Sequence, residues 1–161
     1  MIENHRTKKQ DETLIAYCGL HCGDCVIYGG KIADLSKELL SRLKESEFNR
    51  LALGLSTMFP DLKSLKNYEQ FCDVLAALNW VRCHKICRQG GGTTGCKIRA
   101  CCLEKSIEGC WVCEQSENCE LLAWLKPIHG NGYAKNLRII REKGKEVFLR
   151  EERFWYDAED G

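Results

Sequence analysis

Apolar residues recur at three- and four-residue spacing through the middle of the chain, which is the period of an amphipathic helix. The first such segment covers residues 31–46, with Lys, Glu and Arg opposite an apolar face of Ile32, Leu35, Leu39, Leu40 and Leu43. A second helix is expected over 48–58, ending before Pro60. A third is expected over 62–81, with an apolar face of Leu65, Tyr68, Phe71, Cys72, Leu75, Leu78 and Trp80.

The C-terminal third repeats this periodicity in shorter segments. Helices are expected over 117–126, ended by Pro127, over 132–143, ended by Gly144, and over 145–153. The aromatic run 154–156 is expected to pack against the core. Because alternating strand patterns are scarce, the pattern predicts an all-α fold, a helical domain with irregular cysteine-rich metal-binding loops.

Length and charge limit the interpretation further. The 161 residues suit one domain, and we expect a flexible tail over 1–13 and a single helical metal-binding domain over 14–161. The formal net charge of +1 provides no global attraction to nucleic acid or to membrane. The polar start lacks the apolar core of a signal peptide, and no run approaches the roughly 18 apolar residues of a membrane helix. A cytoplasmic protein is therefore expected.

The 12 cysteines are the main chemical feature of the chain. In a reducing compartment clustered thiols bind metal or take part in redox chemistry rather than forming disulfides. Zinc requires four ligands in a tetrahedron, and a C-x2-C pair in a tight turn presents two thiolates on one side. Ten cysteines fall in such pairs or within reach of them, and these are the candidate metal ligands: Cys18, Cys22, Cys25, Cys83, Cys87, Cys96, Cys101, Cys110, Cys113 and Cys119.

The other two cysteines fit a ligand role less well. Cys72 lies on the apolar face of an expected helix, where a buried thiol packs as a small hydrophobe. Cys102 adjoins Cys101, and chain neighbours seldom bind the same ion. His21 and His84 lie within the clusters but compete with many thiols. For His129 a connecting turn is favoured over acid–base chemistry, because no partner carboxylate or nucleophile is evident. No catalytic or other cofactor-binding residues are expected.

Residues 82–99 carry five cations and no acid, namely Arg82, Lys85, Arg88, Lys97 and Arg99. One interpretation is that they offset the charge of about −2 on a zinc held by four thiolates. The alternative is a nucleic-acid surface. Charge compensation is favoured because five acids follow in 104–120, so the basic patch is not continuous.

Several literal motif matches fail their context tests. The segment 90–95 matches G-x-G-x-x-G and resembles a P-loop, but no strand precedes it. Cys18, Cys22 and Cys25 have the C-x3-C-x2-C spacing of radical SAM enzymes, without the usual aromatic residue before the last Cys and without enough chain for their barrel. An iron–sulfur cluster on these thiols stays open as an alternative to zinc.

Five segments together carry a family resemblance. They are YCGLHCGDC at 17–25, CRQGGG at 87–92, CKIRACCLEK at 96–105, GCWVC at 109–113 and CELL at 119–122. This set resembles a family of small cysteine-rich prokaryotic proteins, frequent in anaerobes and of unknown function, over residues 17–155. The resemblance implies a zinc-binding protein and no established activity.

The sequence therefore predicts a zinc-binding structural or interaction protein with about two Zn²⁺ per chain, since two sites take four thiolates each. The alternatives are an iron–sulfur or thiol redox protein or enzyme using the N-terminal cluster, and a nucleic-acid binder using residues 82–99. A protein partner is compatible with the first, and whether the chain is an enzyme stays open. We expect one ion to be shared by Cys83, Cys87, Cys96 and Cys101, and another by Cys18, Cys22, Cys25 and a later cysteine.

Overall fold

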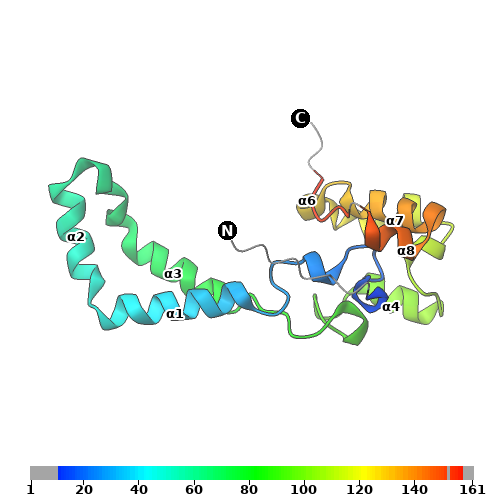
Figure 1. The fold of residues 1–161 in the computed structure, drawn as a ribbon, viewed down its shortest axis with the longest axis horizontal. Coiled ribbons are helices and arrows are strands. Elements are labelled where there is room, and N and C mark those ends of the chain that lie inside the picture. The colour runs from blue at the N-terminus through cyan, green and yellow to red at the C-terminus, as the bar shows by residue number, and fades with distance from the viewer. Residues whose placement is uncertain (1–10, 152, 158–161) are drawn as a thin grey trace. The chain divides into compact units, whose positions relative to one another are not determined.

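A computed structural model describes residues 11–151 and 153–157 (Figure 1). Eight α-helices and six short 3-10 helices follow one another within these residues, and the β pairs there are isolated bridges. The all-α fold is therefore confirmed. No helix among the described residues is both long and apolar enough to cross a membrane.

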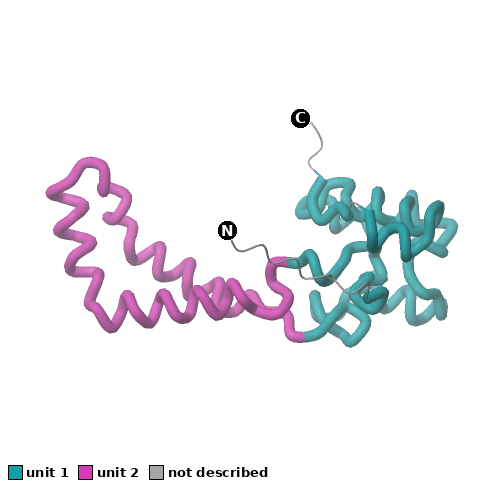
Figure 2. The backbone as a smooth tube through the Cα atoms, viewed as in Figure 1, with its two compact units in different colours: residues 1–25, 85–161 teal, residues 26–84 magenta. Residues whose placement is uncertain are grey.

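The chain forms two compact units (Figure 2). One unit contains residues 26–84, which are continuous in sequence. The other is assembled from residues 1–25 and 85–161 on either side of that insertion. The expectation of a single domain over 14–161 stays a prediction, because compactness alone does not show whether either unit folds independently.

The unit of residues 26–84 is built from α1 (Lys31–Glu45), α2 (Phe48–Met58), the 3-10 helix η3 (Pro60–Asn67) and α3 (Tyr68–Leu78). Its ends meet where Gly29 N–H donates to the Cys83 carbonyl oxygen at 3.0 Å. Helices α1 and α3 therefore run antiparallel, and they contact each other. Few side chains are buried here: Ala33, Ser36, Ala52 and Leu75.

The other unit contains the main hydrophobic core. Its helices are short: α4 (Lys97–Glu104), α5 (Glu120–Ala123), α6 (Lys126–His129), α7 (Gly132–Lys143) and α8 (Lys145–Arg150). The core joins the N-terminal segment 15–20 to these helices, and its fully buried side chains include Ile15, Leu122, Asn136 and Phe148. Three of its 3-10 helices begin with a cysteine (Cys22–Asp24, Cys87–Gln89 and Cys110–Val112), and Cys101 and Cys102 lie on α4.

Polar contacts hold the C-terminal segment onto this core. The Asn136 amide donates to the Phe154 carbonyl oxygen at 2.8 Å and accepts from the Phe154 N–H at 3.0 Å. His129 Nδ1 lies 2.8 Å from the Trp155 carbonyl oxygen, and its ring packs edge-on against the indole. The expected packing of the aromatic run is therefore observed for Phe154 and Trp155, which are half-buried, whereas Tyr156 is 59% exposed. His129 has a structural role.

Several element boundaries differ from those expected. Helix α4 forms inside a stretch expected to be irregular, and the last helix, α8, ends at Arg150. Pro127 lies in the first turn of α6 instead of ending a helix, since proline lacks only an N–H that a first turn does not use. Most of the tail expected over 1–13 lies outside the described residues, but Glu12 begins a 3-10 turn (Glu12–Leu14) capped by Asp11.

We expect Asn136→Ala to lower the free energy of unfolding by about 2–3 kcal/mol, because it removes a buried side chain and leaves the partly buried N–H and carbonyl oxygen of Phe154 unpaired. Urea unfolding would measure the change. Asn49→Ala, at an exposed position on α2, is the matched control and is expected to change stability little. Equal effects of the two substitutions would contradict this role for Asn136.

Candidate metal centre

Two C-x2-C pairs fold into the same local structure. Cys22–Asp24 and Cys110–Val112 each form a one-turn 3-10 helix. The turns close with Cys25 N–H donating to the Cys22 carbonyl oxygen at 3.2 Å, and Cys113 N–H donating to that of Cys110 at 3.1 Å. Such a turn keeps the two thiols of a pair close together, as a tetrahedral site requires.

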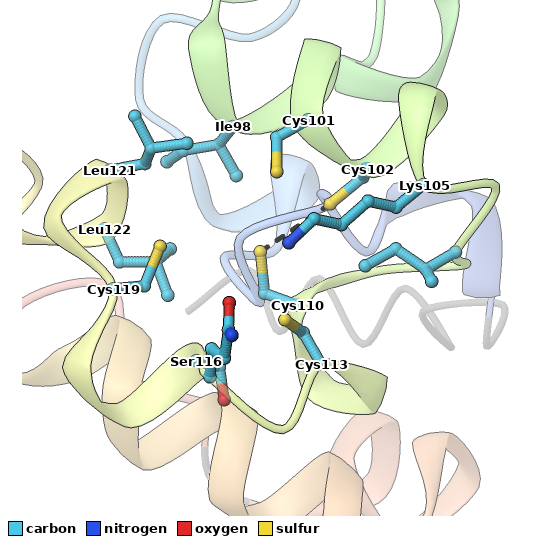
Figure 3. A pocket seen from close by; sticks show the side chains of 12 residues that line it. Ile98, Cys101, Cys102, Lys105, Cys110, Cys113, Ser116, Cys119, Leu121 and Leu122 are labelled. Carbon is cyan, nitrogen blue, oxygen red and sulfur yellow. Dashed lines mark hydrogen bonds between the residues drawn. The ribbon is translucent and has the colours of Figure 1, made fainter.

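Five thiols, here called the pocket thiols, line one cavity of about 40 Å³. Figure 3 shows their side chains reaching the same space from three segments: α4, the 110–113 turn and the start of α5. A cavity of this size exceeds the roughly 10–15 Å³ that a single water needs, so it can admit one ion. The pocket thiols are Cys101, Cys102, Cys110, Cys113 and Cys119.

Within this pocket Cys102 and Cys110 are in direct contact. Their sulfurs lie 3.7 Å apart, and both residues are buried. The hydrogen bond between the two thiols lowers the pKa of Cys102. The same hydrogen bond, together with burial, raises the pKa of Cys110.

A second set lies where the N-terminal segment meets the residues after 85; we call Cys18, Cys22, Cys87 and Cys96 the N-terminal thiols. The Cys87 N–H donates to the Cys22 sulfur at 3.4 Å. Burial raises the pKa of the Cys18 thiol to about 12, and the nearby Cys87 and Cys96 add to that rise. Thiols that raise one another's pKa are close enough to interact through charge.

Arg153 anchors the first of the two turns. Its guanidinium donates to both carboxylate oxygens of Asp24, at 2.7 and 3.1 Å. His21 Nδ1 lies 3.3 Å from the same carboxylate. Burial opposes ionisation of Asp24, but the contacts with His21 and Arg153 outweigh it and hold its pKa well below the usual range. The turn is thereby tied to the C-terminal segment.

Arg141, on α7, anchors the second turn in a similar way. It donates to the carbonyl oxygens of Trp111 and Cys113, at 3.0 and 3.1 Å, and to the Ser116 hydroxyl. One side chain therefore fixes the backbone on both sides of Val112. A planar guanidinium with five donors suits this task better than a lysine would.

Three of the five basic side chains in residues 82–99 make contacts within their own unit. Arg88 donates to the Ile15 carbonyl oxygen and lies 4.5 Å over the Tyr17 ring. Arg99 donates to the Gly91 carbonyl oxygen at 2.6 Å and Arg82 pairs with Asp34. These contacts direct three of the five cations toward backbone, rings or a carboxylate.

The glycine run is explained by its backbone. Gly90 has φ +87°, a left-handed conformation that favours glycine. A Cβ added to Gly91 would lie 1.6 Å from the Lys85 carbonyl oxygen, so only glycine fits the closed loop. The literal nucleotide-motif match in 90–95 therefore reflects a tight turn after Cys87.

The structure groups the thiols differently from the expected sets. Cys101 lies with Cys110, Cys113 and Cys119, whereas Cys87 and Cys96 interact with Cys18. Cys83 belongs to the unit of residues 26–84, where its backbone forms an isolated β-bridge with Tyr28. The half-buried Cys72 is also in that unit. Over residues 11–151 and 153–157, no three Cys, His, Asp or Glu side chains already stand close enough to hold an ion.

Sequence reasoning missed the residues that support the turns, chiefly Asp24, Arg141 and Arg153. No spacing rule links Asp24 to a residue 129 positions away. Arg141 offered a weak signal only, as a charged residue beside the apolar stripe of its helix.

The chain belongs to the family described as "Protein of unknown function (DUF3795)", whose model matches residues 14–124. The resemblance to a cysteine-rich family of unknown function is thus confirmed. Neither the curated proteins nor the solved structures contain a significant match.

The raised pKa of Cys18 gives a pH dependence that can be measured on reduced, metal-free protein. The folded thiol holds its proton up to about pH 12, whereas the unfolded thiol loses it near 9.0. The folded state therefore binds more protons between these values, and stability falls as pH rises through that window, by up to about 1.4 kcal/mol per pH unit. Urea unfolding in steps across the window should show a shallower fall for Cys18→Ala. Parallel profiles of stability against pH for the wild type and Cys18→Ala would contradict the raised pKa of Cys18.

Proposed function

We propose that this protein is a zinc-binding structural or interaction protein in which two sets of thiolates hold one ion each. The observation that carries the proposal is the convergence of the pocket thiols on one cavity. Four of its five thiols suffice for a tetrahedral Zn²⁺ site. We assign Cys101, Cys110, Cys113 and Cys119 to it, with Cys102 as a buried neighbour. The N-terminal thiols supply the second set.

The donor chemistry supports zinc on two grounds. Thiolates are ligands that zinc prefers, and the Cys110–Val112 turn has the local structure that brings the assigned Cys110 and Cys113 together. The Cys87 N–H already donates to a sulfur of the second set, and such bonds stabilise a thiolate.

The proposed ions would act as cross-links. Helices α4 and α5 have eight and four residues, lengths at which an isolated helix is marginal in water. An ion in the pocket would join both helices to the 110–113 turn. The other would join the N-terminal segment to the loop after residue 85. A reducing compartment such as the cytoplasm keeps these thiols available.

One observation favours a second candidate function, thiol redox chemistry or an iron–sulfur cluster. The pocket holds one thiol more than a tetrahedral ion uses, and the extra sulfur of Cys102 touches that of Cys110. Nucleic-acid binding is less favoured. Arg82, Arg88 and Arg99 make contacts within the protein, so fewer basic groups of residues 82–99 are left to bind phosphate.

Elemental analysis of protein purified without oxygen tests the proposal. We expect two zinc ions per chain, and one each in Cys113→Ser and Cys87→Ser, which remove a thiolate from different sets. Cys72→Ser is the matched control and should keep both ions. Iron with sulfide in the wild type would favour an iron–sulfur cluster, and protein without metal would contradict both kinds of metal site and favour thiol redox chemistry.

Chelation tests the structural role. Removing zinc should lower the free energy of unfolding by about 4 kcal/mol or more per site where free zinc exceeds the dissociation constant about 1,000-fold. Circular dichroism and thermal melts would follow the loss. Unchanged helix content and melting temperature after complete removal would show that the ions are not structural.

A further inference from the structure

Cys102 is the pocket thiol that the proposed zinc site does not use. Its side chain is buried, and its sulfur lies 3.7 Å from the sulfur of Cys110, which the proposed site does use. Figure 3 marks this contact with a dashed line. A thiol outside the proposed ligand set is therefore in direct contact with a ligand.

The chain between the two cysteines turns back on itself and brings them together. At the end of α4 the Ile107 N–H donates to the Cys102 carbonyl oxygen at 2.9 Å. The reversal passes through Ser106, whose φ of +53° is left-handed. On the other side, the Cys110 N–H donates to the Tyr17 carbonyl oxygen at 2.8 Å. Backbone hydrogen bonds therefore anchor both members of the pair.

The separation of the two sulfurs is compatible with a disulfide. An S–S bond is about 2.05 Å long, so sulfurs 3.7 Å apart need to approach by about 1.7 Å. The fold has already closed the short loop between the two residues, so little further chain entropy is lost. Cys113 shares a C-x2-C turn with Cys110, but the proposed site uses both of those thiolates. The Cys102 thiol is the one left to react.

We propose that Cys102 and Cys110 are a site of reversible oxidation by a peroxide, and that their disulfide opens the zinc site of the pocket. This inference rests on the proposed function, because it takes Cys110 as a ligand. The disulfide leaves three thiolates in the ligand set, those of Cys101, Cys113 and Cys119. Three thiolates do not complete the closed four-ligand set of a structural zinc site.

The oxidation consumes one peroxide and two thiols. The Cys102 thiolate attacks one peroxide oxygen, the O–O bond breaks, and hydroxide leaves while a sulfenic acid forms on Cys102. The Cys110 thiolate then attacks that sulfur, the S–O bond breaks, and a second hydroxide leaves. Each hydroxide takes up a proton. The two sulfurs thus lose two electrons, which reduce the peroxide to two waters.

A peroxide suits this buried pair better than a larger oxidant does. The cavity that both thiols line has a volume of about 40 Å³, against roughly 10–15 Å³ for one water. A molecule with two heavy atoms is small enough to enter, whereas a peptide disulfide is too large. Cys101, Cys113 and Cys119 line the same cavity and are partly exposed, so it can be reached from solvent.

Hydrogen peroxide treatment of zinc-loaded, full-length Cys87→Ser tests the proposal, because this variant should hold the pocket ion alone. A chromophoric chelator would report zinc release, a thiol reagent would count the remaining thiols, and mass spectrometry of proteolytic peptides would locate the disulfide. We expect about one zinc ion released for two thiols lost, with Cys102 and Cys110 joined. Dithiothreitol with added zinc should reverse both changes.

Cys102→Ala in the same background separates this route from general oxidation. It should keep the pocket ion and release it at least about tenfold more slowly under peroxide, because the attacking thiol is absent. Cys72→Ala, which removes a half-buried thiol of the other unit, is the matched control and should behave like its parent. In metal-free protein the disulfide between Cys102 and Cys110 should still form, so the bond is also tested without the ion.

The failure of this inference can be told apart from the failure of the proposed function. Protein that binds no zinc would overturn the proposed function and the release of an ion with it. Three results would overturn this inference alone: a pocket ion that stays bound under peroxide, a disulfide between Cys110 and Cys113 instead, or release from Cys102→Ala as fast as from its parent. A Cys102→Ala variant with its parent's circular dichroism but without the pocket ion would make Cys102 a ligand and would also overturn it.

Discussion

In the unit of residues 1–25 and 85–161, the turns that contain cysteines are held in place by helices that are too short to be stable alone. Helices α4, α5, α6 and α8 have between four and eight residues. Helices of this length depend on tertiary packing. The core supplies part of that packing, since Ile15, Leu122 and Phe148 are fully buried. Many other side chains in or against this core are cysteines. The chemical state of these thiols therefore affects the stability of the whole unit.

Arginines support those turns without metal. Arg141 holds the turn that contains Cys110 and Cys113, Arg153 holds the turn of Cys22 through Asp24, and Arg99 holds the loop after Cys87. Each donates to backbone carbonyls or to a carboxylate inside the fold. A different arginine acts on a thiol through its charge, since Arg88 helps the hydrogen bond with Cys110 to lower the pKa of Cys102.

Local patterns predicted much of the helical content, because amphipathic spacing reports directly which face of a helix is buried. Helices 31–46, 48–58 and 132–143 correspond closely to α1, α2 and α7. Helix α4 was missed because its two adjacent cysteines and mixed charges carry little periodicity. The thiol grouping could not be read from spacing, since Cys96 and Cys101 lie close together in the sequence but have different neighbours in the fold.

The two units differ in which side chains they bury. In the unit of residues 1–25 and 85–161, several partly buried cysteines pack against a core that includes Trp111 and Leu122. In the unit of residues 26–84, the small residues Ala33 and Ser36 are buried, while Leu35 and Val74 are more than half exposed. Burial of small side chains removes little apolar surface from water, so the hydrophobic effect stabilises this unit less than the unit that contains the main core.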